Sequence, residues 1–454
     1  MSRLAFWFAL AIFVIQIILA VFHHPVFWGS EMETLSSFFN VKFLIDYLGF
    51  IALLCIGITS LASLLVGRYT IFEEDQRFKF INLLIIASIG MSGVVIAKDI
   101  FTLYVFLEVT AIASFILIAF NKDLYALEGA FKYLVLSFIA TVLMLSGIAL
   151  MLLASGDTTY SALALALNNS PSSHIITFGM GMFICGLLIK GGIMPFHGWL
   201  PDAYMAAPPA VSVLLAGVVT KIAGVYALMR IISSAFGFAE GIMNLLMALG
   251  ALSIVVGAIA ALGQNDFKRM LSYSSISQVG YILLGFATAT PLGVAGAAFH
   301  LFNHSVFKSL LFVNSAAVET QIGTNDMDRM GGLSARMPVT GATSMIGFLS
   351  AAGMPPLAGF WSKLIIILAL WQAGRHAYAI IALLAGILTL AYLLSMQQRV
   401  FFGKLADGLE DLREARSGIV FVSVILALIT IGVGLAFPVF FNYMIVPVKE
   451  LLVR

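Results

Sequence analysis

Charged side chains are scarce in this chain. Asp, Glu, Lys and Arg make up 10% of its 454 residues, while hydrophobic residues make up 61%. Because soluble domains ordinarily carry about 25% charged residues, this composition excludes an ordinary soluble protein. The net charge of +2 comes from scattered basic residues, and not from the basic stripe that binds nucleic acid. The sequence therefore predicts an all-α, polytopic membrane protein whose surroundings are the lipid bilayer.

Cysteines and cofactor motifs are also few. Cys55 and Cys185 both lie in apolar runs without a CxxC spacing, which favours neither a disulfide nor a metal cluster. The sequence has no HExxH motif, no nucleotide-binding motif and no paired haem histidines on separate helices. We therefore predict no metal and no cofactor, so the energy for any coupled work must arrive through partner subunits.

Long apolar runs are abundant. A helical crossing needs about 20 residues, and thirteen runs are long enough: 4–22, 44–67, 78–98, 99–120, 126–154, 176–200, 208–231, 241–263, 269–290, 293–318, 338–374, 376–402 and 417–445. The first run follows Arg3 and is typical of either a signal peptide or a membrane anchor. The lack of a small-residue cleavage site before His23 favours the anchor.

Two of these runs are predicted to be broken helices. Gly191, Gly192 and Pro195 interrupt the sixth run, directly after Lys190. The eleventh is too long for one crossing, and Gly353, Pro355, Pro356 and Gly359 interrupt it shortly before Lys363. In lipid, the backbone groups freed by such breaks are tolerated only where protein or a wet cavity satisfies them. A broken helix that carries one lysine near mid-depth is therefore a candidate ion site.

The basic residues predict the sidedness of the membrane crossings. One side has Arg68, Arg77, Lys79, Lys122, Lys268, Arg269, Arg329, Arg336, Arg399, Lys404, Arg413 and Arg416, and the other has only Lys42, Lys98, Arg230, Arg375, Lys449 and Arg454. The richer side is expected to face the cytoplasm. This places the chain in the cell inner (plasma) membrane, with its N-terminus in the cytoplasm and its C-terminus outside.

The order of the spans predicts an internal repeat. Residues 78–233 and 241–402 each hold five crossings, and an odd number of crossings inverts the second set relative to the first. Residues 1–77 then supply N-terminal helices outside the repeats, and residues 403–454 a cytoplasmic loop and the last helix. The two broken helices fall at equivalent places, so Lys190 and Lys363 are expected to correspond.

Charges inside the spans are the candidate site residues. Glu108 stands at mid-span, where a charge costs from about 3 kcal/mol to more than 10, so it needs a partner, and Lys190 is the first choice. Lys221 lies near mid-span in the next segment, where burial can make a lysine exchange protons. A purely structural ion pair at Glu108, and a purely structural Lys221 bonded to carbonyls, are the alternatives.

Three further residues repeat every fourth position. His300, His304 and Lys308 lie along about 12 Å of one helix, and a row of imidazoles can pass protons through water. Satisfied structural histidines and a metal pair are the alternatives, although no third metal ligand is suggested. Five residues are named in support, from the broken helices and their surroundings: Lys132, Pro195, His197, Asp202 and Pro355.

Five sequence blocks together resemble a known family. They are FLE at 106–108, KGGIMPFHGWLPDA at 190–203, NDFKRMLSYSSISQVGY at 265–281, HLFNHSVFKSLLF at 300–312 and GMPPLAGFWSK at 353–363. In this order they are similar to the antiporter-like membrane subunits of respiratory complex I, Mrp-type cation/proton antiporters and membrane-bound hydrogenases. The similarity runs from about residue 44 to 400.

The resemblance implies a fold and a set of roles. That family has fourteen helices with two inverted five-helix repeats, each a half-channel, so one N-terminal helix is expected to be missing here. Glu108 would be the buried glutamate, Lys221 the bridging lysine, and Lys190 and Lys363 the lysines of the two broken helices. His300 and His304 would be the central histidines. Lys363 stands where one complex I subunit type has a glutamate, which disfavours that type.

The resemblance also implies a function. We expect an ion-translocating subunit, for protons first, in a larger membrane complex that couples redox chemistry or a cation gradient to transport. The redox chemistry would be that of a NADH/quinone-type oxidoreductase or a membrane-bound hydrogenase. Partners would be other membrane subunits, including related antiporter-like ones, with H⁺ and Na⁺ as candidate ions and no nucleic acid. The alternatives are a Na⁺/H⁺ antiporter module of an Mrp-type complex and a structural subunit that conducts nothing.

Overall fold

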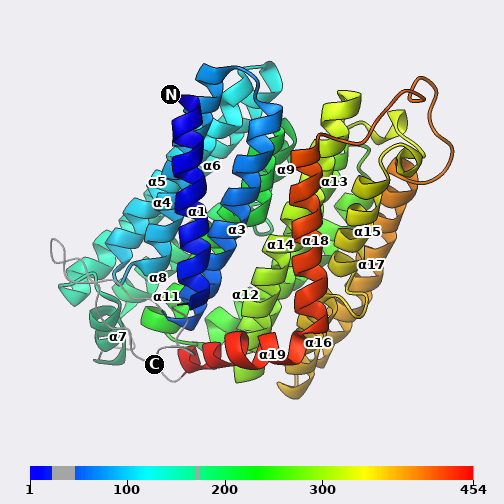
Figure 1. The fold of residues 1–454 in the computed structure, drawn as a ribbon. Helices are drawn as coiled ribbons and strands as arrows, with labels where there is room; N and C mark the ends of the chain where they lie inside the picture. The colour runs from blue at the N-terminus through cyan, green and yellow to red at the C-terminus, as the bar shows by residue number, and fades with distance from the viewer. Residues whose placement is uncertain (23–45, 170–172, 453–454) are drawn as a thin grey trace.

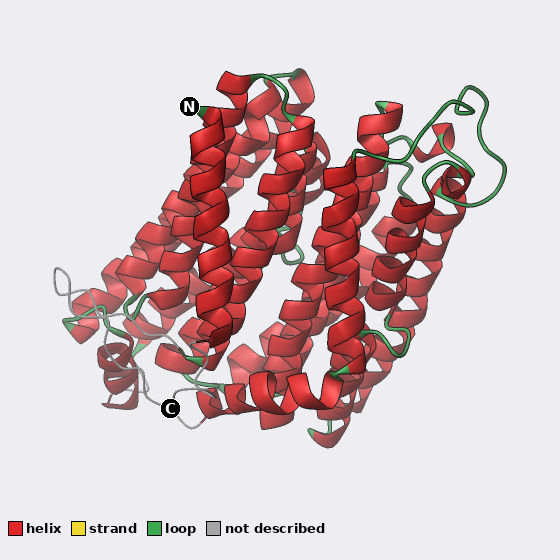
Figure 2. Ribbon diagram, in the orientation of Figure 1, coloured by secondary structure: helices red, strands yellow, loops and turns green. Residues whose placement is uncertain are grey.

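The computed structural model describes residues 1–22, 46–169 and 173–452, and in these ranges the regular elements are helices. Nine of the described helical segments are long and apolar enough to cross a membrane: α1 Ser2–Phe22, α3 Tyr47–Thr70, α4 Glu74–Ile96, α5 with its 3₁₀ extension (Ile100–Asn121), α6 Leu124–Ser155, Pro209–Phe236, α12 Glu240–Leu262, α17 His376–Val400 and α18 Ser417–Leu435. These helices run side by side through the molecule (Figures 1 and 2).

Four more crossings carry more polar residues or are interrupted. Two are the helices α13 Phe267–Ala287 and α14 Pro291–Ile322. The other two are the predicted broken helices, α8 His174–Lys190 followed by α9 Trp199–Ala206, and α15 Pro338–Ala352 followed by α16 Ala358–Gln372. The predicted polytopic all-α fold with about thirteen crossings is therefore confirmed.

Five crossings from α4 to residue 236 and five from α12 to α17 run in opposite senses. The helix α4 starts at the end of the bundle where the N-terminus lies, and α12 starts at the opposite end (Figure 1). Each set contains one helix of 32 residues, α6 or α14, which ends at a glycine with a positive φ, Gly156 at 73° or Gly323 at 79°. Glycine adopts this left-handed cap without the steric penalty of a Cβ atom.

The second helix of each set starts in the same way. Asp99 caps α5 by accepting a hydrogen bond from the Thr102 backbone N–H at 2.7 Å, and Asp266 caps α13 by accepting one from Arg269 N–H at 2.8 Å. Both aspartates also form an isolated β-bridge to the loop after the 32-residue helix of their own set. Equivalent local structures at equivalent places agree with an inverted repeat.

The prediction for the thirteenth span was wrong in its length. We expected one helix over 417–445, but α18 ends at Leu435 and the chain turns into α19 Phe437–Phe440, η7 Phe441–Ile445 and η8 Val446–Leu452. This segment lies across the end of the bundle, near the C-terminus (Figure 1). Pro438 has no N–H with which to continue the ladder of α18, and the Gly434 carbonyl accepts a hydrogen bond from Trp361 instead, at 3.0 Å.

The structure also holds helices that the sequence analysis did not propose. The helix α7 Tyr160–Asn169 lies between α6 and α8. The crossing after α9 contains α10 Pro209–Leu214 and α11 Ala227–Ile231, joined and followed by π-helical turns at η2 Leu215–Val219, η3 Lys221–Tyr226 and η4 Ile232–Phe236. Short 3₁₀ turns, η5 Met327–Arg329 and η6 Leu333–Ala335, precede α15.

Two basic residues that we had counted in loops are buried. Arg230 has no exposed surface because it lies inside α11, and Lys268 is 1% exposed at the start of α13. Both have partners that compensate their charge within the protein, and these partners are described below. Neither residue can therefore report the sidedness of a loop.

Candidate functional site

The first broken helix carries an ion pair. Lys190 ends α8, and its Nζ donates to Glu108 Oε1 on α5 at 3.0 Å and to Ser137 Oγ on α6 at 3.1 Å. Thr141 Oγ donates to the same Glu108 oxygen at 2.7 Å. The lysine side chain is 4% exposed and the glutamate side chain 25% exposed. The predicted pairing of Glu108 with Lys190 is confirmed, and its role in transport stays a prediction.

Lys221 lies beside that break, on the π-helical turn η3. A Cβ atom on Gly224 would overlap the backbone of Gly191, so η3 and the end of α8 touch without a side chain between them. Lys221 is fully buried and donates to the carbonyl of Ala216. π-helical turns recur at functional sites, and both Ala216 and Lys221 lie in such turns.

The predicted polar stripe of α14 lies in the protein interior. His300, His304 and Lys308 have no exposed surface. The rings of His300 and His304 stack with centroids 6.1 Å apart and an angle of 12°. The helix α14 packs against α16, which carries Lys363, and against η2, the turn that comes before Lys221. The stripe is therefore on a helix that contacts the lysine-bearing crossings of both sets.

Lys308 and Lys363 are held by neutral groups. Lys308 Nζ donates to the Leu271 carbonyl at 2.9 Å and to Ser274 Oγ at 2.7 Å. Lys363 Nζ, on α16, donates to the Ala351 carbonyl at 2.7 Å and lies 4.6 Å from the centre of the Tyr281 ring. That carbonyl belongs to the last turn of α15, before the break that contains Pro355.

A cavity of about 260 Å³ borders Lys363. Its lining includes the broken-helix residues Gly353 and Met354, together with Tyr281 and residues of α17. A hydrogen bond of 2.9 Å joins His300 Nδ1 to Ser362 Oγ, one residue before Lys363. The second broken helix thus connects the histidine row to a cavity.

Several interior polar atoms near this row have no hydrogen-bond partner among the described protein groups. They are both ring nitrogens of His304, Nε2 of His300, Oδ1 of Asn303, and both amide atoms of Gln278. Buried polar groups are ordinarily satisfied by protein or by ordered water. These atoms are therefore suited to water that links the histidines.

The supporting residues divide into two groups. Asp202, on α9, accepts from Lys132 Nζ at 2.6 Å and lies 3.4 Å from Arg269 on α13, so it joins the first set to the second. His197 is on the turn that Pro195 opens, and its Nδ1 lies 3.2 Å from the Pro195 carbonyl. His197 is half-buried, and its ring centre lies 6.3 Å from that of Tyr273 on α13.

Comparison with known proteins gives a consistent set of relatives. A family model described as NADH:quinone oxidoreductase/Mrp antiporter, transmembrane, matches residues 97–389. The chain belongs to this family. It is 31% identical over 414 residues to a Na(+)/H(+) antiporter subunit of Alkalihalophilus pseudofirmus, covering 91% of this chain and 84% of that one.

Two more matches are a second relative in sequence and a solved structure. The chain is 32% identical over 371 residues to a subunit of the NADH-quinone oxidoreductase of Desulforudis audaxviator, covering 81% of this chain and 72% of that one. A chain of the Mrp complex from a Dietzia species superposes with a TM-score of 0.91 at 23% identity, covering 99% of this chain and 93% of that chain. That likeness shows the shared fold.

This member of the family also has buried charges that the sequence analysis missed. Arg230 donates from Nη1 and Nη2 to the two carboxylate oxygens of Asp46, each at 2.6 Å, and also to the Tyr226 hydroxyl. Lys268 Nζ donates to the Ala207 carbonyl at 3.0 Å and pairs with Glu319 at 2.7 Å. Arg230 stands alone in an apolar run, which was the available sign that it is not a loop residue, whereas Lys268 is followed by Arg269 and gave no such sign.

Proposed function

We propose that this chain is a proton-translocating, antiporter-like subunit of a multisubunit membrane complex. A buried row of titratable groups supports the proposal most directly. It leads from Lys221 through His304 and His300 toward Ser362 and Lys363, and Lys308 flanks it. Charged groups inside a membrane are rare and ordinarily mark ion paths or proton relays.

The proposed path has an entry, a relay and an exit. In the entry, the Glu108–Lys190 pair changes its charge when an ion arrives, and Lys221 passes the proton on. In the relay, His300 and His304 exchange protons through water, for which their unpaired ring nitrogens are suited. In the exit, Lys363 releases the proton beside the cavity at the second broken helix.

The proposed division into halves follows the repeat. Residues 78–233 would form the first half-channel and residues 241–402 the second, with residues 1–77 and 403–454 outside them. We further propose that the arginine-rich end faces the cytoplasm and that the C-terminus is outside, in a cell inner membrane. The starts of α4 and α12 at opposite ends of the bundle support the inverted order of the two halves.

Exchange of Na⁺ for H⁺ is the second candidate function. Its support is the 31% identity to a protein whose name describes it as part of a Na(+)/H(+) antiporter. Both functions need the same buried lysines, since either must load and unload a proton. They differ in whether Na⁺ on the opposite side is required.

Proton movement into vesicles that contain the whole complex tests the proposal. Glu108→Gln and Lys221→Met should each abolish proton uptake while the complex still assembles, whereas Lys404→Met, at an exposed loop residue, should transport normally. Normal uptake by both of the first two variants would contradict the relay. Replacing Na⁺ by choline then separates the candidates, because only the antiporter stops without Na⁺.

A further inference from the structure

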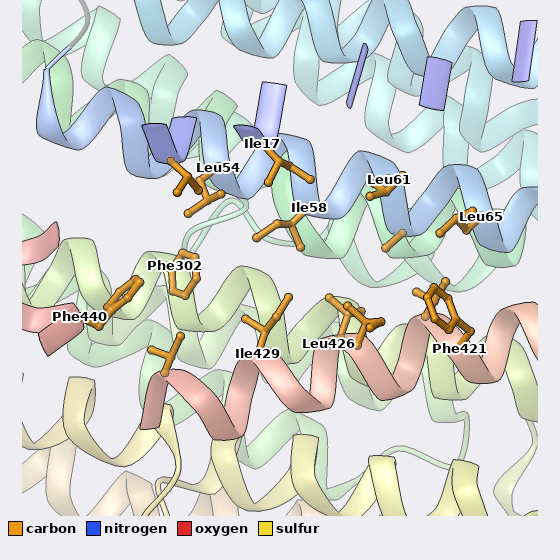
Figure 3. A pocket seen from close by; sticks show the side chains of 15 residues that line it. Ile17, Leu54, Ile58, Leu61, Leu65, Phe302, Phe421, Leu426, Ile429 and Phe440 are labelled. Carbon is orange, nitrogen blue, oxygen red and sulfur yellow. The ribbon is translucent and has the colours of Figure 1, made fainter. Parts of the chain in front are cut away.

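An apolar groove runs along one side of the molecule, apart from the row of titratable residues. It encloses about 440 Å³ between α1 and α3 on one side and α18 on the other, with Phe302 of α14 at its floor (Figure 3). We call it the α1–α18 groove. Its lining consists of Ile17, Val21, Leu54, Ile58, Leu61, Ala62, Leu65, Phe302, Phe421, Val422, Ile425, Leu426, Ile429, Val433 and Phe440.

A second cavity, of about 360 Å³, lies at the end of the bundle where α1 starts. We call it the basic pocket, and its lining consists of Ser2, Arg3, Phe6, Trp7, Arg68, Glu74 and Arg77. Three of these residues are arginines and one is a carboxylate. Since arginine binds phosphate with a fixed fork of N–H donors, this excess favours an anion.

Three side chains of the basic pocket show that it is a built site. Ser2 is 3% exposed, and its Oγ has no hydrogen-bond partner among the described protein groups. Arg77 is held in place because its Nε and Nη2 donate to the Ile71 carbonyl at 3.0 and 2.8 Å. Arg68 is placed over the Phe6 ring, with its Cζ 4.6 Å from the ring centre.

The groove and the pocket lie along the same faces of two helices. On α3, Leu54, Ile58, Leu61 and Leu65 line the groove, and Arg68 lies one turn further on, in the pocket. This spacing of three and four residues keeps all of them on one face. A stripe on α1 has the same arrangement. It leads from Arg3 in the pocket to Val21 in the groove and consists of residues 3, 7, 10, 14, 17 and 21.

The lining and the position of the groove decide what can fill it. Its side chains are all apolar, so it offers no hydrogen bond or charge to a polar ligand. It extends along residues 54–65, about 16 Å of α3, toward the arginines of the basic pocket. A hydrocarbon chain that carries an anionic group at one end matches both features, and a void left empty would forfeit the contacts of its apolar lining.

We propose that the α1–α18 groove and the basic pocket form one binding site for an anionic phospholipid. Arg3, Arg68 and Arg77, with the hydroxyl of Ser2, bind the phosphate of the headgroup, and an acyl chain fills the groove between α3 and α18. Glu74 disfavours a second anionic group, so a headgroup with a single phosphodiester is the expected class. The pocket stands at the end of the bundle, at the level where headgroups meet a membrane protein.

A photoactivatable phosphatidylglycerol with a diazirine in its acyl chain tests the proposal on the full chain, in phosphatidylcholine vesicles that contain its complex. We expect peptides from residues 54–65 and 421–433 to be labelled. Each arginine near an anionic headgroup contributes about fivefold to binding, so Arg3→Gln with Arg68→Gln should reduce this labelling on the order of 25-fold. Arg336→Gln, at an exposed arginine before α15, is the matched control and should change nothing.

Three results would overturn the proposal. A phosphatidylcholine probe of the same chain length that labels these peptides equally would show that the headgroup charge is not read. Competition by glycerol 3-phosphate as strong as that by phosphatidylglycerol would assign the pocket to free phosphate. Crosslinks from the groove to another subunit, in place of lipid, would assign the groove to a protein partner.

The variant Ile58→Trp fills the groove without altering the pocket. It should therefore remove the acyl-chain labelling but not the binding of the headgroup.

Discussion

The two sets of five helices share a framework but treat their lysines differently. In the first set, Lys190 pairs with the carboxylate of Glu108 at 3.0 Å. In the second, Lys363 is held by the Ala351 carbonyl at 2.7 Å and by the face of the Tyr281 ring. An ion pair keeps a lysine charged inside a membrane, whereas a carbonyl serves as partner without fixing a counter-charge.

In the proposed path, this difference would give the two halves different roles. A pair such as Glu108–Lys190 can respond to an arriving ion by exchanging partners, since two charges and two neighbouring hydroxyls share one place. Lys363 lies beside a cavity and has a neutral partner, so its charge can change without leaving a carboxylate behind. On this proposal, the first half would admit an ion and the second would release one.

The largest expected effect is at Lys363. Lys363→Arg should abolish proton transport, because arginine holds its proton throughout the accessible pH range, while Lys363→Glu should keep part of it. Lys190→Arg should also keep part, since Glu108 can still change its charge. Proton uptake by vesicles containing each assembled variant checks this order, and full uptake by the Lys363→Arg variant would make Lys363 a fixed charge only.

The second effect concerns stability. Glu108→Leu leaves Lys190 buried without a counter-charge, and removing one partner of a buried pair destabilises by about 3–5 kcal/mol. Lys363→Leu removes a charge that has no carboxylate partner, so it should destabilise less. Thermal unfolding midpoints of the variants in detergent test the difference.

The matched control is the double variant Glu108→Leu with Lys190→Leu. It should recover most of the stability that Glu108→Leu loses, because no unpaired charge remains. If the double variant unfolds as early as the single one, the contact between Glu108 and Lys190 is not the source of the loss.

The sequence was informative where a break or a charge stood out within an apolar run. Glycine and proline revealed both broken helices, and Glu108 and Lys190, although 82 positions apart, were paired because they were isolated mid-span charges of opposite sign. Arg230 was misplaced because its partner Asp46 is 184 positions away. The crosswise segment after Leu435 was missed because its residues are as apolar as a membrane span, and nothing local in the sequence marks the π-helical turns around Lys221.

A third effect tests the similarity of the halves. Gly156→Ala and Gly323→Ala should each destabilise by about 1 kcal/mol, because both glycines have a positive φ. A Cβ atom would meet nothing within 4 Å at either place, so strain in the backbone is the shared cause. Gly181→Ala, in the middle of α8 and equally open, should be neutral or stabilising. Unequal losses at Gly156 and Gly323 would contradict the equivalence of the two caps.

The smallest expected effect concerns the capping residue Asp266, which interacts electrostatically with Lys268, Arg269 and Glu319. Burial raises the pKa of Asp266 above its usual value, although its hydrogen bond from Arg269 N–H and the two cations oppose the shift. A raised carboxyl pKa favours the folded state below about pH 4, and this contribution is lost as the pH rises through the folded-state pKa. Asp266→Asn should therefore gain stability relative to the unchanged protein on going from acid to neutral pH.

Asp266→Ala separates this effect from the cap itself. It should lose about 1 kcal/mol with the hydrogen bond to Arg269 N–H, whereas Asp266→Asn keeps an oxygen that can accept that bond. Thermal midpoints recorded in detergent from acid to neutral pH give both comparisons. If the difference between Asp266→Asn and the unchanged protein stays constant with pH, Asp266 does not titrate differently in the folded and unfolded states. The aspartate would then act at the start of α13 only as a cap.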